Sequence, residues 1–238
     1  MVPRLTSAER LFVALDFASA GPARRLVGQL GSHAVAYKVG LQLLTAEGPA
    51  LVRELVAAGK QVFLDLKLFE IPNSVAGAMA AAGELGVAMV TVHASAGTDV
   101  LRAAVQAARP YPGLRVLALT VITSMDAPGL AEVGVPGSVE DQVLRLARLA
   151  AAAGCHGVVA SPQEAAVLRA VLPTPMLIVT PRHPAGGRRC HGPCPHGRPA
   201  GSPSRRCHAP GGGPLHHRRR RPAGGVPGRL RTNCSGRG

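Results

Sequence analysis

Short aliphatic runs alternate with longer Ala- and Leu-rich patterns from residue 10 to residue 180, and this alternation constrains the fold most strongly. The short runs predict seven strands, near 11–16, 34–39, 61–66, 87–92, 114–120, 156–160 and 175–180. The longer patterns predict helices near 20–30, 42–58, 73–85, 97–109, 139–153 and 162–171. Strands that are separated by helices pair in parallel through right-handed crossovers. The chain is therefore predicted to be an α/β protein, a (β/α)8 TIM barrel whose eighth unit is missing or out of frame.

A doubly wound open sheet is the alternative architecture, but no glycine fingerprint follows the first predicted strand. The barrel is favoured because polar residues stand where the predicted strands end, for example Asp16, Lys38 and Asp65. In barrels of this kind, the carboxyl ends of the strands carry the chemistry.

The apolar run VFLDLKLFEIPNS at residues 62–74 contains three charged side chains. Because a strand has a period of two, Asp65 and Lys67 share one face with Phe63, while the leucines at 64, 66 and 68 share the other. Alternate residues of a strand lie about 6.5 to 7 Å apart. Asp65 and Lys67 are thus expected to interact through a common ligand or through Lys38 at the end of the preceding strand.

This Lys, Asp, Lys array has two interpretations. A buried ion pair can serve only to fix strand register, and such pairs add little net stability. That role needs two charges, whereas the third charge on the neighbouring strand favours a functional site.

The residues resemble orotidine 5'-phosphate decarboxylase over about residues 9–181. DLKLFEIPNS at 65–74 is similar to that family's signature, Asp-x-Lys-x-x-Asp-Ile-Pro-Asn-Thr. Six further motifs match in order and spacing: VALD at 13–16, YKVG at 37–40, TVHASAG at 91–97, LTVITSMD at 119–126, GVVASPQE at 157–164 and IVTP at 178–181.

The resemblance implies a homodimeric barrel that converts orotidine 5'-monophosphate to UMP and carbon dioxide without a metal or an organic cofactor. It assigns a catalytic array to Lys38, Asp65, Lys67 and Glu70, with residue 70 reaching in from the other subunit and Lys67 as the proton donor to C6 of the pyrimidine. It also implies contacts to ribose, phosphate or base at four positions: Asp16, Ser74, Thr123 and Ser124. A preplaced ammonium suits this chemistry, because loss of carbon dioxide leaves negative charge on a ring carbon.

Two signature positions depart from the family pattern. Glu70 stands where Asp is usual and adds one methylene to a side chain that must be held accurately. Ser74 stands where Thr is usual and keeps the hydroxyl.

His93 can be read either as a ligand or as a hydrogen-bonded core histidine.

Residues 182–238 have a different composition from the rest of the chain. All 13 acidic residues lie before residue 182, whereas 13 of the 27 Lys and Arg lie after residue 181. The formal net charge of +14 therefore belongs largely to this segment, and the body is close to neutral. With 13 Gly, 9 Pro and no Ile, Met, Phe or Tyr, the segment is expected to be a disordered tail after a barrel domain at 1–181.

A frameshift accounts for this change. In the family, Thr-Pro continues into Gly-Ile-Arg-Pro, a phosphate loop that contains Gln, an eighth strand and a Gly-Arg pair. The codons CGG-CAT-CCG-GCC encode the Arg-His-Pro-Ala found at 182–185, and the same bases read one position later encode Gly-Ile-Arg-Pro. Loss of the phosphate contacts predicts an impaired enzyme.

Alternative functions follow from the same residues. A related sugar-phosphate decarboxylase or aldolase would use a similar array with a metal. The tail could bind zinc through CHGPCPH at 190–196, but it has no regular Cys-x2-Cys pair. It could also bind RNA, but it has no Tyr, Phe or Trp for stacking. We expect no specific nucleic-acid partner, no membrane partner and, from the lone body cysteine at 155 and the absence of a signal segment, a cytoplasmic location.

Overall fold

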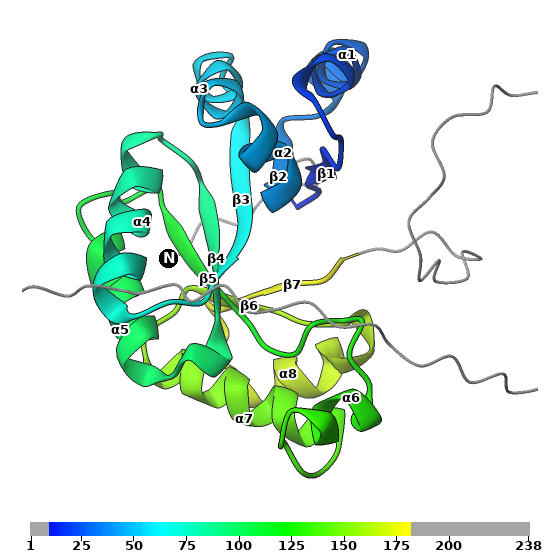
Figure 1. The fold of residues 1–238 in the computed structure, drawn as a ribbon, viewed down its shortest axis with the longest axis vertical. Coiled ribbons are helices and arrows are strands. Elements are labelled where there is room, and N and C mark those ends of the chain that lie inside the picture. Colours follow the sequence, from blue (N-terminus) through cyan, green and yellow to red (C-terminus); the bar gives the residue numbers. More distant parts are fainter. Residues whose placement is uncertain (1–9, 182–238) are drawn as a thin grey trace, which may run out of the picture. The chain divides into compact units, whose positions relative to one another are not determined.

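Seven parallel strands form one curled sheet in the computed structural model, which describes residues 10–181 (Figure 1). Each strand pairs with the next along the chain, in the order β1 to β7. The strands are β1 Val13–Ala14, β2 Ala36–Gly40, β3 Gln61–Leu68, β4 Met89–His93, β5 Arg115–Leu119, β6 Gly157–Val159 and β7 Leu177–Val179. The arrangement is that of a (β/α)8 TIM barrel that lacks its last unit among the described residues, as predicted.

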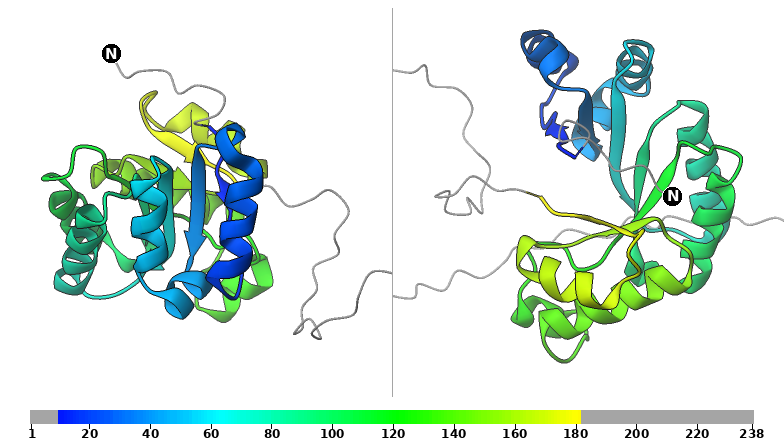
Figure 2. Two further views of the ribbon diagram at one scale, coloured as in Figure 1. Left: turned by 90° about the horizontal axis from the view of Figure 1, so that it is seen from above. Right: turned by 180° about the vertical axis from the view of Figure 1, so that it is seen from behind.

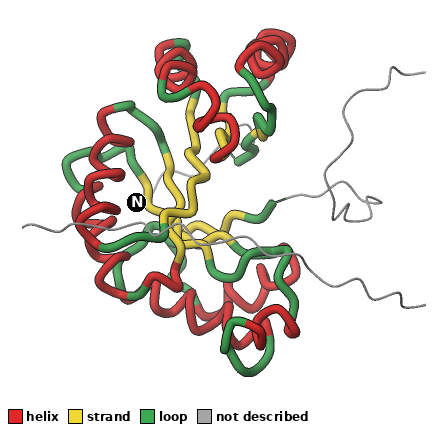
Figure 3. Tube along the Cα trace, in the orientation of Figure 1, coloured by secondary structure: helices red, strands yellow, loops and turns green. Residues whose placement is uncertain are grey.

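Helices cover the outer side of the curl, as the colouring by secondary structure shows (Figure 3). The α-helices are α1 Ala20–Leu30, α2 Leu41–Glu47, α3 Ala50–Ala57, α4 Pro72–Glu84, α5 Thr98–Ala108, α6 Ala127–Glu132, α7 Val139–Ala152 and α8 Ala165–Val171. Three short 3-10 helices are η1 Gly31–His33, η2 Ala94–Ala96 and η3 Pro162–Glu164. Views from above and from behind show β1 and β7 as the two edges of the sheet (Figure 2).

Two helices differ from the sequence prediction. The helix predicted at 42–58 is two helices, because Gly48 adopts φ +64° and Pro49 follows it, so the helix ends and a new one begins. The short α6 was not predicted. Its first turn is capped by Asp126, whose carboxylate accepts a hydrogen bond from Gly129 N–H at 3.0 Å.

Side chains alternate between two apolar layers. On the outer face, strand residues such as Leu64 and Val90 pack with helix residues in the main core. On the concave face, Phe63, Met89 and Leu117 form a separate cluster of strand residues. Because side chains alternate along a strand, the residue two positions after each inward-facing residue also faces inward. This places Asp65 on the concave face after Phe63.

Within residues 10–181, no helix is both long and apolar enough to cross a membrane. The predicted tail at 182–238, with its candidate zinc and RNA ligands, lies outside the described residues. The domain boundary at residue 181 therefore stays a prediction.

Candidate active site

A β-bulge shapes the end of β3. Phe63 and Leu64 pair with Met89 and Val90 of β4, and the next pair is Leu68 with Val92. From Leu64 to Leu68, β3 advances by four residues while β4 advances by only two, from Val90 to Val92. At the bulge, Lys67 has φ +51°, the one positive φ of a non-glycine residue in the described part of the chain.

Asp65 and Lys67 were expected to interact through a common ligand or through Lys38, but they contact each other directly despite the bulge. Lys67 Nζ donates to Asp65 Oδ2 at 2.8 Å. The leucines of the other face behave as expected too, since Leu64 is buried in the main core and Leu66 and Leu68 pack against it. Simple alternation predicted which residues meet but not the left-handed backbone that joins them.

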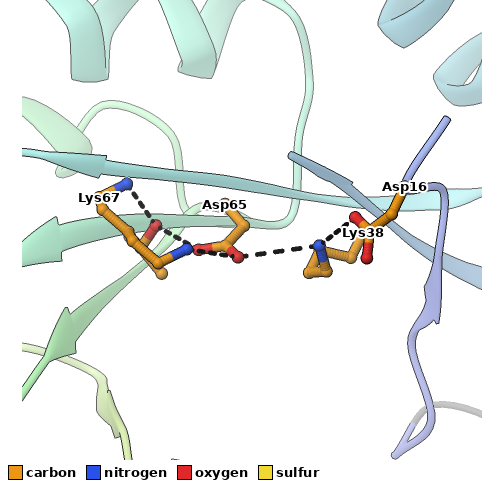
Figure 4. A network of polar contacts seen from close by, with 5 residues as sticks. Asp16, Lys38, Asp65 and Lys67 are labelled. Carbon is orange, nitrogen blue, oxygen red and sulfur yellow. Dashed lines mark hydrogen bonds and ion pairs between the residues drawn. The ribbon is translucent and has the colours of Figure 1, made fainter. Parts of the chain in front are cut away.

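Four charged side chains form a continuous row across the carboxyl ends of β1, β2 and β3 (Figure 4). Lys38 Nζ donates to Asp16 Oδ1 at 2.8 Å and lies 3.8 Å from Asp65 Oδ2. Asp65 is the most buried member of the row, with 16% of its side chain exposed, and Lys67 is 40% exposed. One carboxylate therefore lies between two ammonium groups, and the row carries equal numbers of positive and negative charges.

Thr91 joins the array from β4, and the sequence reasoning missed it. Its hydroxyl accepts a hydrogen bond from Lys67 N–H at 2.8 Å and donates one to Asp65 Oδ1 at 3.0 Å. Thr91 is fully buried. A signal for it existed, because it is the one hydroxyl residue in the strand MVTVH and stands two positions after the inward-facing Met89.

His93, at the end of β4, makes local contacts. Its Nδ1 accepts a hydrogen bond from Ser95 N–H at 3.3 Å, and its ring meets the ring of Phe69 edge-on at 5.4 Å. Burial, and after it the positive charge of Lys67, lower the pKa of His93 below its usual value. These contacts match the hydrogen-bonded histidine of the two interpretations. Among residues 10–181, no group of three or more His, Cys, Asp or Glu side chains is placed to hold a metal ion.

Glu70 and Ser74 lie beyond the row, after β3. Glu70 is exposed, its Oε1 accepts a hydrogen bond from Ile71 N–H at 2.7 Å, and none of the ion pairs in the described residues includes it. Ser74 is exposed in the first turn of α4. The structure therefore brings together Asp16, Lys38, Asp65 and Lys67 but does not bring Glu70 to them within one chain.

Thr123 and Ser124 lie in the turn between β5 and α6. Met125 N–H closes this turn by donating to Ile122 O at 2.8 Å. Thr123 is half-buried and Ser124 is exposed. Because the turn follows the carboxyl end of β5, it lies at the same end of the sheet as the row.

The row can stabilise negative charge and deliver a proton. Lys67 provides a partly exposed ammonium whose position is set by Asp65 and by the bulge. A carboxylate such as Asp65, if placed beside a substrate carboxylate, raises the energy of that bound state, although the weight of this effect in catalysis is disputed. The geometry thus suits reactions that develop a carbanion and then protonate it.

Comparisons with known proteins point to one family. The model of the family described as "Orotidine 5'-phosphate decarboxylase / HUMPS family" matches residues 9–190. Orotidine 5'-phosphate decarboxylase of Anaeromyxobacter dehalogenans is 48% identical over 182 residues, which are 76% of this chain and 79% of that protein. The enzyme of the same name from Halorhodospira halophila is 50% identical over 179 residues, 74% of this chain and 76% of its own.

A solved structure is similar as well. The crystal structure of orotidine 5'-phosphate decarboxylase from Lactobacillus acidophilus superimposes with a TM-score of 0.68 at 32% identity, covering 71% of this chain and 79% of that one. Sequence and fold thus lead to the same group of proteins, and the chain belongs to the orotidine 5'-phosphate decarboxylase / HUMPS family.

Proposed function

We propose that the chain decarboxylates orotidine 5'-monophosphate to UMP and carbon dioxide, a step of pyrimidine biosynthesis, in the cytoplasm. The observation that carries the proposal is the unbroken row of Asp16, Lys38, Asp65 and Lys67 at the carboxyl end of the sheet. Relatives at 48% and 50% identity that bear the name of this enzyme support the choice of substrate.

In the proposed reaction, the bond between C6 of the pyrimidine and the carboxylate carbon breaks, and its electron pair stays on C6. Lys67 Nζ stabilises this charge and then transfers a proton to C6, which yields UMP, and the amine regains a proton from water. Asp65 holds Lys67 by its 2.8 Å ion pair and faces the substrate carboxylate. Asp16, Ser74, Thr123 and Ser124 are proposed to contact ribose, phosphate or base.

No metal or organic cofactor is required by this scheme. Rates measured with added magnesium and with a chelator are expected to agree. A rate that depended on magnesium would favour the related metal-dependent chemistry instead.

The proposal includes a homodimer in which Glu70 completes the site of the second copy. Glu70 is exposed and lies between the large apolar residues Phe69 and Ile71, which are 64% and 62% exposed. Large apolar side chains so placed favour a protein interface. An interface there would bury them and carry Glu70 toward the lysines of the other chain.

Complementation tests the shared site. Lys67→Ala and Glu70→Gln each inactivate one contributor, so a mixed dimer of the two variants has one intact site of two. After unfolding and refolding together, the mixture is expected to recover about a quarter of the unmodified rate, because half of the dimers are mixed. If mixing recovers nothing while the mass in solution is that of a dimer, Glu70 does not act across the interface.

The tail at 182–238 is proposed to be translated out of frame, with the phosphate loop and Gly-Arg pair of the family lost. Each charge-assisted hydrogen bond to the phosphate is worth about 1.5–3 kcal/mol. Because remote binding energy supports the reacting centre, their loss lowers the rate as well as the affinity. The chain as written is therefore expected to be a weak decarboxylase.

Two measurements test the function. DNA sequencing across the codons for Thr180 to Ala185 decides whether the frame changes there. Decarboxylation is then measured by the absorbance change from substrate to UMP, for the chain as written and for the chain read one base later. If the frame-corrected chain has no activity, the proposed function is wrong. If the frame-corrected chain is active and the chain as written is not, the result supports both the decarboxylase function and the out-of-frame tail.

A further inference from the structure

We propose that Thr91 is a positioning residue that holds Lys67 and Asp65 in their reactive geometry. The inference deepens the proposed function and rests on it. Thr91 is fully buried, so its effect on a substrate passes through the two residues that it binds.

The bulge creates the need for such a residue. Between Leu64 and Leu68, the regular pairing of β3 with β4 is interrupted. A buried N–H that loses its place in the ladder needs another acceptor. Thr91 Oγ1 supplies it to Lys67 N–H at 2.8 Å.

The same hydrogen bond supports an unusual backbone conformation. Lys67 has a backbone φ of +51°, a value that residues other than Gly, Asn and Asp rarely adopt. Such a conformation persists when its surroundings determine it. Without the Thr91 acceptor, the backbone of Lys67 can relax toward ordinary φ values, and the start of its side chain then turns away from Asp65.

The hydroxyl also orients the carboxylate. Once Thr91 Oγ1 accepts from Lys67 N–H, its own proton is free to point to Asp65 Oδ1, 3.0 Å away. Oδ2 then faces the two ammonium groups, Lys67 at 2.8 Å and Lys38 at 3.8 Å. One side chain thus ties the backbone of the proton donor to the carboxylate that holds its ammonium.

Valine and serine separate this role from simple packing. Val has nearly the shape of Thr and suits a strand, but it neither accepts nor donates a hydrogen bond. Ser keeps the hydroxyl and loses the methyl. Thr120, the other buried threonine of residues 10–181, is the matched control because its hydroxyl donates to Val159 O at 3.0 Å and to no member of the row.

Two readouts are measured on the full chain. The first is amide hydrogen exchange at Lys67 N–H by NMR, which does not depend on activity. Thr91→Val is expected to speed this exchange roughly tenfold and Thr91→Ser to restore it to within about threefold. Thr120→Val should leave the exchange of Lys67 N–H unchanged, although it should lower the melting temperature by about as much as Thr91→Val does.

The second readout is the rate of decarboxylation, in the chain that proves active. Thr91→Val is expected to lower kcat roughly 10- to 100-fold with little change in KM, since a small misplacement of reacting groups has effects of this size. Thr91→Ser should recover most of kcat, and Thr120→Val should keep it.

The outcomes separate the two proposals. Unchanged Lys67 exchange in Thr91→Val, or a kcat equal to that of Thr120→Val, overturns the positioning role. If no frame of the chain decarboxylates the substrate, the proposed function fails, and Lys67 exchange alone then decides whether Thr91 fixes the pair.

Discussion

The strands β2 and β3, which carry Lys38, Asp65 and Lys67, and their neighbour β4 differ from the strands at the far edge of the sheet. β3 has eight residues and β2 and β4 have five each, whereas β6 and β7 have three each. The first four residues of β3 include three buried ones, whereas all three residues of β7 are only half-buried. Lys38, Asp65 and Lys67 thus stand on well-paired strands, whereas Asp16 follows the short edge strand β1 and the other edge, β7, pairs only with β6 among the described residues.

This difference implies that the proposed catalytic array and the pairing of β6 with β7 can be changed separately. Changes in the row should affect the chemistry more than the stability. Changes between β6 and β7 should do the reverse.

The largest expected effect comes from removing the ammonium of Lys67. Lys67→Gly should lower the rate of decarboxylation roughly 10²- to 10⁴-fold, the usual contribution of a positioned proton donor. Glycine adopts φ +51° without strain, so the free energy of unfolding should change by less than about 1 kcal/mol. Lys67→Ala is the control that loses the same ammonium and keeps the strained backbone. If the variant keeps more than one tenth of the unmodified rate, and urea unfolding shows an unchanged free energy of unfolding, then Lys67 is not the proton donor.

Asp65→Asn should affect both chemistry and stability. It leaves the ammonium groups of Lys38 and Lys67 without their shared carboxylate, so the rate should fall about 100-fold. Loss of its charge-assisted hydrogen bonds should lower the free energy of unfolding by about 1–3 kcal/mol. The control is Glu54→Gln, which breaks an exposed ion pair to Arg24 of 2.8 Å and should lower it by less than about 1 kcal/mol. If Asp65→Asn and Glu54→Gln lower the free energy of unfolding equally, the ion pairs of Asp65 stabilise the fold no more than an exposed surface ion pair does.

Gly157→Ala tests the other half of the sheet. A Cβ at Gly157 would lie 2.6 Å from Leu177 O and 2.9 Å from Leu117 Cδ2, so β6 and β7 must move apart. Overpacking of this kind lowers the free energy of unfolding by about 1–3 kcal/mol. Gly28→Ala is the control, because an exposed helix position with open space around it should gain up to about 1 kcal/mol. If Gly157→Ala instead abolished Lys67 amide protection, the two halves would be coupled.

The sequence predicted the parts of this fold that follow from periodicity. All seven strands were placed within a few residues, because each is an aliphatic run between helices. The break between α2 and α3 was missed, although Gly48 and Pro49 indicate it in the sequence. The short α6 was missed because it depends on the Asp126 cap more than on a long apolar pattern.

The site was predicted as far as strand alternation reaches. Asp65, Lys67 and Lys38 were expected to meet, and they do. The bulge at Lys67 could not be predicted, because it depends on the register between β3 and β4 and has no local signal such as a glycine. Thr91 was missed for the same reason, since its role exists only where the bulge frees the Lys67 N–H.

The smallest expected effect is a change in how stability depends on pH, through His93. Burial and the charge of Lys67 lower its pKa in the folded chain, so near pH 6 the unfolded chain binds more protons than the folded one. The contribution of neutral His93 to stability is therefore fully present above the usual histidine pKa and is lost as the pH falls through the folded value. His93→Gln should unfold with a smaller loss of stability between pH 7.5 and pH 5.5, measured in urea, whereas His33→Gln, at an exposed position in η1, should keep the loss. An unchanged loss in His93→Gln would show that protonation of buried His93 does not weaken the folded chain in acid, and the loss would then belong to other groups, such as His156, whose pKa burial also lowers.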